Sequence, residues 1–213
     1  ALRQLISRAV SSEGVVDIFA AAGLKKPDVS ILSDEFLAEV QGMARRNLAV
    51  ELLNKLLSGE IERRGRKNVV QARSFRQMLE ESIRKYQNRA VETAQIIEEL
   101  IALAKEMREA DRRGQDLGLS EDEIAFYDAL EANDSAVKIL GDDTLRTIAQ
   151  ELLQAVRKNV TIDWTVRENV RANMRVTIKR ILPRYGYPPD KQERATALVL
   201  EQAEVICREA VEG

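Results

Sequence analysis

The stretch SIRKYQNRAVETAQIIEELIALAKEMRE, residues 82–109, decides the fold class, because it contains neither glycine nor proline. Through this stretch and just before it, apolar side chains recur at steps of three and four residues, which places them on one face of a helix. They are Leu79, Ile83, Tyr86, Ala90, Ala94, Ile97, Ile101, Ala104 and Met107. We therefore expect one long helix over about 75–113, which begins after a capping box formed by Ser74 and Gln77.

The rest of the chain also predicts helices rather than strands. Aromatic residues make up only 4% of the sequence, alternating runs of Val, Ile and Thr are absent, and Ala, Leu, Glu and Arg are frequent. Capping residues and glycines set the expected bounds of further helices at about 2–11, 15–22, 34–41, 47–58, 121–131, 135–140, 143–159, 165–182 and 190–211. The predicted fold is all-α: a multi-helix bundle built around the long helix, with no sheet.

The basic stretch EIERRGRKN, residues 60–68, separates two predicted parts of the chain. Four cations surround Gly65 there, which is typical of a polar hinge. They are Arg63, Arg64, Arg66 and Lys67. We expect residues 1–68 to form a helical linker subdomain and residues 69–213 to form a C-terminal helical bundle. Because the first residue is not Met, we also expect the chain to be a piece of a longer protein.

The composition excludes several classes of catalytic site. The chain has no histidine and one cysteine, which removes imidazole-dependent nucleophiles, the common zinc sites and thiolate clusters. The phosphate-binding pattern Gly-x-x-x-x-Gly-Lys-Ser/Thr is absent, and no lysine has an acidic residue two positions before it, as in Mg²⁺-dependent nucleases. We expect no catalytic, cofactor-binding or metal-binding residue in this chain, and therefore no enzyme activity of its own.

Positive and negative charges nearly balance, since 33 Lys and Arg face 35 Asp and Glu, for a net charge of -2. This balance excludes a global basic field, so that any contact with nucleic acid depends on a local patch. No apolar run reaches about 18 residues, and we expect no membrane span. The single cysteine, Cys207, lies in a periodic apolar run and is expected to be a buried thiol in a reducing compartment.

A basic row in WTVRENVRANMRVTIKR, residues 164–180, is the candidate binding surface. Its cations recur at four-residue steps beside an apolar row and continue past it. They are Arg167, Arg171, Arg175, Lys179, Arg180 and Arg184. Such a row can follow a phosphate backbone or contact an acidic partner, although the simpler interpretation is the solvated flank of a packed helix. Trp164, Tyr185 and Tyr187 are candidate interface anchors, although core positions are favoured for them.

Several runs of the sequence carry a likeness to one family. They include VVDIFAAAGLKKPDVSILSDEFLAEV, RKNVVQARSFRQMLEESIRKYQNRAVETAQIIEELIALAKEM, LSEDEIAFYDAL and RKNVTIDWTVRENVRANMRVTIKRIL. The most specific parts are NVTIDWTVRE and YGYPPDKQ. Over nearly its whole length, the chain resembles the C-terminal helical region of the motor/restriction subunit of type I restriction enzymes.

This resemblance implies an upstream Mg²⁺-dependent endonuclease domain and two helicase-like domains that hydrolyse ATP to translocate duplex DNA. ATP and Mg²⁺ would then bind outside this chain. The resemblance also implies modification and specificity subunits as partners, and a location in the cytoplasm of a bacterium or archaeon. We expect a non-catalytic assembly domain that docks the translocase and nuclease onto the modification–specificity core. The alternative is a DNA-contacting clamp that supports translocation through the basic helix surface.

Overall fold

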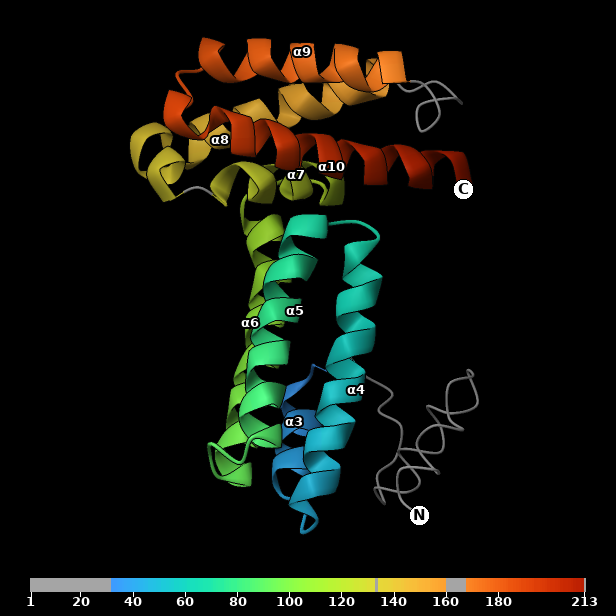
Figure 1. Cartoon of the computed structure of the whole chain (residues 1–213), viewed down its shortest axis with the longest axis vertical. Coiled ribbons are helices and arrows are strands. Elements are labelled where there is room, and N and C mark those ends of the chain that lie inside the picture. The colour runs from blue at the N-terminus through green and yellow to red at the C-terminus, as the bar shows by residue number, and fades with distance from the viewer. Residues whose placement is uncertain (1–31, 133, 160–167, 213) are drawn as a thin grey trace. The chain divides into compact units, whose positions relative to one another are not determined.

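The computed structural model describes residues 32–132, 134–159 and 168–212, and every regular element in these ranges is a helix (Figure 1). The all-α class is therefore confirmed for the described part of the chain. The helices expected at 2–11 and 15–22 lie outside these ranges. Within them, no helix combines the length and the apolar character needed to cross a membrane.

The elements, labelled as in Figure 1, are α3 (Asp34–Gln41), α4 (Arg46–Gly65), α5 (Val69–Gln87), α6 (Thr93–Asp116), α7 (Glu121–Glu131), α8 (Asp134–Asn159), α9 (Glu168–Arg184), the short 3₁₀ helix η1 (Pro189–Lys191) and α10 (Gln192–Glu212). Two predicted helix starts are confirmed by their caps. Ser33 Oγ accepts a hydrogen bond from the Phe36 N–H at 3.3 Å ahead of α3. Ser120 and Glu123 form the expected capping box at the start of α7.

The predicted long helix is wrong in one respect, because a turn at residues 88–92 divides it into α5 and α6. Arg89 adopts a left-handed conformation there, with φ 51°. The Arg89 N–H donates to Tyr86 O at 3.1 Å and the Ala90 N–H donates to Lys85 O at 3.0 Å, which is the Schellman pattern that ends a helix. Apolar spacing could not reveal this turn, since it reports which face of a helix is buried rather than where the helix ends.

Helices α5 and α6 lie side by side as a hairpin (Figure 1). Ser82 Oγ donates a hydrogen bond to Glu99 Oε2 at 2.9 Å, and Lys85 Nζ lies 3.1 Å from both oxygens of the same carboxylate. One acid of α6 therefore contacts two consecutive turns of α5. These bonds lie close to the turn and hold the two helices in register there.

Replacing Arg89 with glycine should stabilise the turn between α5 and α6. The left-handed conformation that Arg89 adopts raises the conformational free energy of a residue with a Cβ by roughly 1 kcal/mol. Glycine does not have this cost. We expect the free energy of unfolding to rise by about 0.5 kcal/mol, because the greater flexibility of glycine in the unfolded chain offsets part of the gain. Urea denaturation measures the difference, with Arg89→Ala as the control that keeps a Cβ. A less stable glycine variant would show that the arginine side chain itself supports the turn.

The basic stretch 60–68 is mostly helical, which corrects the predicted hinge. Helix α4 continues through Gly59, where a helix end was expected, and ends at Gly65. Only the last three residues of the stretch form a turn. Leu57 and Ile61 are each 1% exposed on either side of Gly59. Their burial outweighs the loss of about 1 kcal/mol in helix propensity that one glycine causes.

Helix α5 begins earlier than predicted. The expected start after Ser74 lies inside the helix, which begins at Val69. Asn68 Oδ1 accepts a hydrogen bond from the Gln71 N–H at 3.0 Å and so caps the first turn. The sequence carries this signal, an Asn followed three residues later by Gln, inside the stretch that was interpreted as a hinge.

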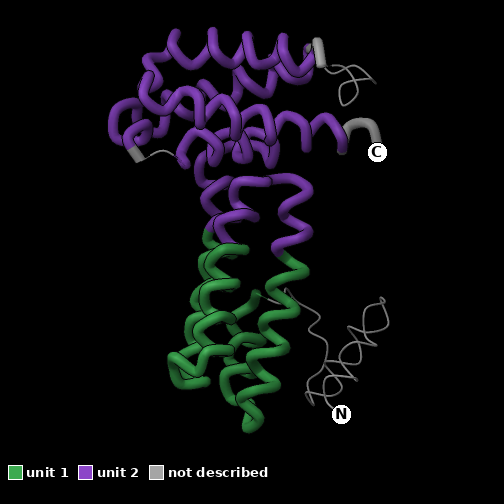
Figure 2. The backbone as a smooth tube through the Cα atoms, in the orientation of Figure 1, with its two compact units in different colours: residues 1–60, 76–109 green, residues 61–75, 110–213 purple. Residues whose placement is uncertain are grey.

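The chain forms two compact units, which Figure 2 draws in different colours. The first unit contains residues 1–60 and 76–109, and the second contains residues 61–75 and 110–213. Helices α4, α5 and α6 each contribute residues to both units. The predicted division at residue 68 into a helical linker subdomain and a C-terminal helical bundle stays a prediction.

The first unit buries one face of α3 and faces of the long helices. Its largest buried side chains include Phe36, Leu37, Leu52, Leu53, Leu57, Ile96, Leu100 and Met107. Arg108 of α6 fastens the start of α3, since its Nη1 donates to Leu32 O at 3.2 Å and its Nη2 donates to Asp34 Oδ1 at 3.0 Å. An apolar core and one bridging arginine thus join the elements of this unit.

Helix α7 lies at the centre of the second unit. Residues 125–130 are all buried, as expected for a helix that neighbours cover on several sides. It packs against α8 and α10, and α9 packs against the same two helices. Gly141 has φ 71° and interrupts α8, which confirms the separate helices expected at 135–140 and 143–159.

Candidate functional site

Helix α9 carries the predicted basic row. Its apolar face belongs to the core of the second unit and consists of Met174, Ile178, Ile181 and Leu182. This burial turns the cations toward solvent, where all five are exposed: Arg171, Arg175, Lys179, Arg180 and Arg184. No acidic residue occurs between residues 169 and 184. The solvent-facing side of α9 is therefore strongly basic, although the net charge of the chain is -2.

Three of these cations are paired with acids of the neighbouring helices. The ion pairs are Arg171 with Glu204, Lys179 with Glu193, and Arg184 with Glu151. The hydrogen bond from Lys179, 2.5 Å long, lowers the pKa of the Glu193 carboxyl. Arg171 Nε lies 2.7 Å from Glu204 Oε1 but does not form a hydrogen bond with it. Solvent screens exposed pairs of this kind, so they orient these side chains more than they stabilise the fold.

The other two cations of the row, Arg175 and Arg180, differ from these three in their ion pairing. Arg175 and Arg180 make no ion pair with any residue of the ranges that the structure describes. Between them lies Val176, an apolar side chain that is 56% exposed. The described residues thus give Arg175 and Arg180 no salt bridge and leave Val176 exposed, although Arg175, together with Lys179, helps to lower the pKa of the Glu193 carboxyl.

The predicted aromatic anchors have different environments. Tyr187 is 1% exposed, and its hydroxyl donates to Leu130 O at 2.9 Å, so it is a core residue. Tyr185 is half-buried, and its hydroxyl donates to Glu151 Oε2 at 2.7 Å. Trp164 and Arg167 lie outside the described ranges. A binding role for any of these residues stays a prediction.

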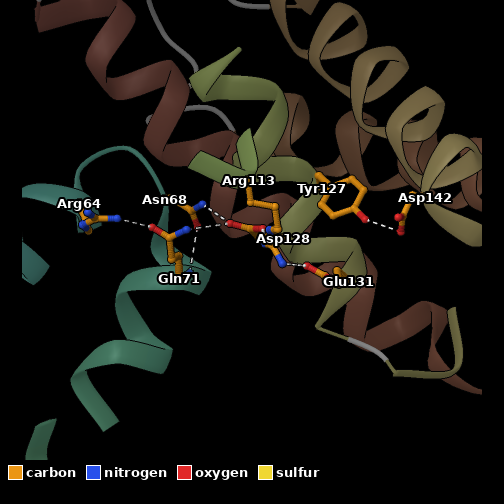
Figure 3. Close-up of polar contacts among 8 residues, drawn as sticks. All are labelled: Arg64, Asn68, Gln71, Arg113, Tyr127, Asp128, Glu131 and Asp142. Carbon is orange, nitrogen blue, oxygen red and sulfur yellow. Dashed lines mark hydrogen bonds and ion pairs between the residues drawn. The ribbon is translucent and has the colours of Figure 1, made fainter. Parts of the chain in front are cut away.

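A buried polar network surrounds Asp128 of α7, also within the second unit (Figure 3). Asn68 Nδ2 donates to Asp128 Oδ2 at 2.6 Å, and Gln71 Nε2 donates to the same oxygen at 3.3 Å. Arg113 donates to Asp128 Oδ1 and also lies 2.8 Å from Glu131 Oε2. The carboxylate of Asp128 thus ties the turn before α5 to the end of α6 and to α7.

Burial makes the charge of this carboxylate costly. It raises the pKa of Asp128 to about 6, although Arg113 and Asn68 favour the charged form. Burial also opposes the charge of the Arg113 guanidinium, but the carboxylates of Asp128 and Glu131 raise its pKa overall. The network therefore holds an acid whose protonation changes close to neutral pH.

The stability of the chain should depend on the protonation of Asp128. Its pKa is about 6 in the folded chain and near 3.8 when unfolded. Between these values the folded state binds more protons than the unfolded state, so stability falls as the pH rises through this window and is then constant. We expect the free energy of unfolding, relative to Asp128→Asn, to fall by at most about 1.4 kcal/mol per pH unit there. Urea denaturation of both proteins from about pH 4 to about pH 8 measures this difference in the free energy of unfolding. A difference that does not change with pH would contradict the prediction.

The described side chains can be compared with what metal binding and nucleophilic catalysis require. Within the described ranges, no group of three or more His, Cys, Asp or Glu residues is placed to hold a metal ion. Burial raises the pKa of the Cys207 thiol to about 11, so little thiolate is available for attack. Burial likewise raises the pKa of the Tyr127 hydroxyl, which donates to Asp142 Oδ1 at 2.9 Å (Figure 3). The exposed cations of α9 form a basic surface on a packed scaffold, and such a surface is suited to binding.

Sequence reasoning missed the network around Asp128. The available signal is an acid within the run EIAFYDAL, residues 123–130, where most other positions are apolar. A charge among buried positions requires partners. Those partners, Asn68 and Arg113, lie 60 and 15 residues away in the sequence, and no local pattern identifies them.

The sequence is similar to known proteins over almost its whole length. Residues 1–209 match the family model described as "Type I restriction enzyme HindI endonuclease subunit-like, C-terminal". The chain is 38% identical over 208 residues to the type I restriction enzyme HindI endonuclease subunit of Haemophilus influenzae, which covers 98% of this chain and 20% of that protein. It is 34% identical over 186 residues to the putative type I restriction enzyme MjaIXP endonuclease subunit of Methanocaldococcus jannaschii, which covers 87% of this chain and 18% of that protein. The chain thus spans about a fifth of the length of these relatives. No solved structure matches it significantly.

Proposed function

Because the chain belongs to the family of HindI-like C-terminal regions of type I restriction enzyme endonuclease subunits, we propose that it is the helical assembly domain of such a subunit. Family membership confirms the resemblance found in the sequence. In this proposal the domain contributes no reacting group. It docks an ATP-dependent translocase and nuclease onto a core of modification and specificity subunits.

The observation that supports docking is the exposed surface of α9. One face of this helix is anchored in the core of the second unit, while the other carries five cations and no acid between residues 169 and 184. Arginine is enriched at protein interfaces, and four of the five cations are arginines. A helix of 17 residues offers a face about 25 Å long to a partner.

Light scattering after size-exclusion chromatography tests the docking proposal. The chain is mixed with an assembled modification–specificity complex, without DNA and at physiological salt. We expect one peak whose mass includes both components, since docking of this kind buries at least about 1,000 Å² of surface. Two separate peaks would overturn docking through these residues.

A DNA-contacting clamp is the second candidate, because the same five cations of α9 can follow a phosphate backbone. It predicts that the affinity for duplex DNA falls steeply with salt, with a slope set by the number of phosphates contacted. Fluorescence anisotropy of a labelled duplex, titrated with the chain at several salt concentrations, measures this slope. If the chain does not bind duplex DNA, or if its affinity does not change with salt, the clamp function is excluded.

We propose further that ATP and Mg²⁺ act in the part of the subunit that this chain does not include, and that the assembly works in the cytoplasm. The first part of this proposal is supported by the fact that the chain spans about a fifth of each relative named an endonuclease subunit. The pure chain should neither hydrolyse ATP nor cleave DNA in the presence of Mg²⁺. Either activity, retained through a second purification, would contradict a non-catalytic role.

A further inference from the structure

The outward face of α9 carries an apolar strip. Val176 is 56% exposed, and within the described ranges only Ile139 is a more exposed large apolar side chain. Ala172 and Pro183 are also exposed. At about 100° per residue, both lie within about 40° of Val176 around the helix axis. The three side chains therefore follow one line along the helix.

Cations border this strip on both sides. Arg175 and Lys179 lie about 60–100° to one side of Val176 around the helix axis. Arg180 and Arg184 lie about 40–80° to the other side. No acidic residue of α9 lies among them. The face is therefore apolar along its centre and positive along both edges.

The four cations that border the strip differ in whether they form ion pairs within the described part of the chain. Lys179 and Arg184 are paired with acids of α10 and α8, respectively. Arg175 and Arg180 make no ion pair with a residue of the described ranges. Exposed pairs are weak, so a well-placed acid of a partner can compete for the paired cations and can bind the other two directly.

This pattern fits a docked helix better than a phosphate backbone. Duplex DNA offers charge along its backbone but little apolar surface to cover Val176. An amphipathic helix that lies along α9 places its apolar side chains on the strip and its acids beside the cations, as helices do in coiled coils. The result is an apolar interface centre with a charged rim, which is the usual anatomy of a protein–protein contact.

We propose that the outward face of α9 binds an amphipathic helix of a partner subunit whose apolar side chains are bordered by Asp and Glu. The centre of this face consists of Ala172, Val176 and Pro183, and its borders carry Arg175, Lys179, Arg180 and Arg184. In the complex, Val176 is covered, and Arg175 and Arg180 gain acidic partners. This inference rests on the proposed docking function and specifies the surface and the chemistry of the partner.

The test measures the affinity of the full-length endonuclease subunit for the assembled modification–specificity complex, without DNA. The test variant carries Val176→Glu and Arg180→Glu, which place acids on the strip and on its edge. The matched control carries Ile139→Glu and Arg112→Glu, which make the same changes at an exposed large apolar side chain of α8 and at an exposed arginine of α6. We expect the Kd of the test variant to rise by at least about 30-fold and that of the control by less than about threefold.

The outcomes separate this inference from the function on which it rests. If the unaltered subunit does not bind the complex, docking fails and this inference fails with it. If the unaltered subunit binds and the test variant binds equally well, docking stands and the assignment to α9 is wrong. Thermal unfolding of both variants, which change exposed side chains only, establishes that they remain folded.

Photo-crosslinking supplies a readout that does not depend on charge reversal. A photoreactive amino acid replaces Val176 in the full-length subunit, and the adduct formed in the assembled complex is mapped by mass spectrometry. We expect the adduct in a partner helix with acids beside its apolar positions. An adduct with duplex DNA alone, or with a partner segment that is basic or not helical, would overturn the proposal.

Discussion

Replacing Gln202 with leucine should lower the free energy of unfolding of the second unit by about 2–4 kcal/mol. Gln202 is 0% exposed on α10. Its Nε2 donates to Lys67 O at 2.6 Å, and its Oε1 accepts a hydrogen bond from the Val69 N–H at 3.0 Å. Leucine fills a similar volume but forms neither bond. A buried polar group that loses its partner costs about 1–3 kcal/mol, and this change affects two of them.

The loss of stability should be large because Gln202 holds the turn between α4 and α5 in place. The turn at residues 66–68 joins α4 to α5, and within the second unit it is bonded from two directions. Gln202 of α10 binds its backbone, and Asp128 of α7 accepts a hydrogen bond from the Asn68 side chain at 2.6 Å. Loss of the glutamine removes the two hydrogen bonds through which α10 holds Lys67 and Val69.

Urea denaturation followed by far-UV circular dichroism measures this change. The control is Gln154→Leu, which alters an exposed glutamine of α8 and should change stability by less than about 0.5 kcal/mol. If Gln202→Leu were as mild as this control, the two backbone bonds would not contribute as proposed. The stability of the second unit would then depend on its apolar core and its other polar contacts.

Local signals were sufficient to predict the fold class and several helix starts. Ser33 and the capping box of Ser120 and Glu123 lie next to the helices that they begin, so their effect needs no knowledge of distant residues. Gly141 ends a helical segment for an equally local reason, since its φ of 71° suits a residue without a Cβ. Each of these predictions depends on a few consecutive residues.

The turn between α5 and α6 could not be predicted in the same way. The usual sign of a helix end is glycine at the left-handed position, and here that position is Arg89. The apolar spacing also continues across the turn, from Leu79 in α5 to Ile97 and Ile101 in α6, because both helices bury a face. Tertiary packing therefore decided this boundary.

The candidate site was predicted in part. The period of α9 placed its cations on a solvent-facing side, but the acids that pair with three of them belong to α8 and α10. Sequence spacing within one helix carries no information about such neighbours. The exposed strip at Val176 was missed for the same reason, because a valine on a helix is usually assigned to the core until the packing of all helices is known.

Tyr187 shows how burial decides between two interpretations that the sequence left open. Truncation of Tyr187 to alanine should destabilise the second unit by about 3–5 kcal/mol, which is the usual cost of removing a large buried ring. The side chain is 1% exposed, and its hydroxyl donates to Leu130 O at 2.9 Å. Gly186, with φ 73°, turns the chain just before it and directs it back toward the core.

Two further variants separate a core role of this tyrosine from an interface role. Tyr187→Phe keeps the ring and removes one buried hydrogen bond, so it should cost about 1 kcal/mol. Tyr185→Ala is the control, because that side chain is half-buried and should cost less than Tyr187→Ala. Urea denaturation gives the three stabilities, and titration with the modification–specificity complex gives the docking affinity. A core role requires that Tyr187→Phe leave docking unchanged, whereas weaker docking at unaltered stability would identify Tyr187 as an interface anchor.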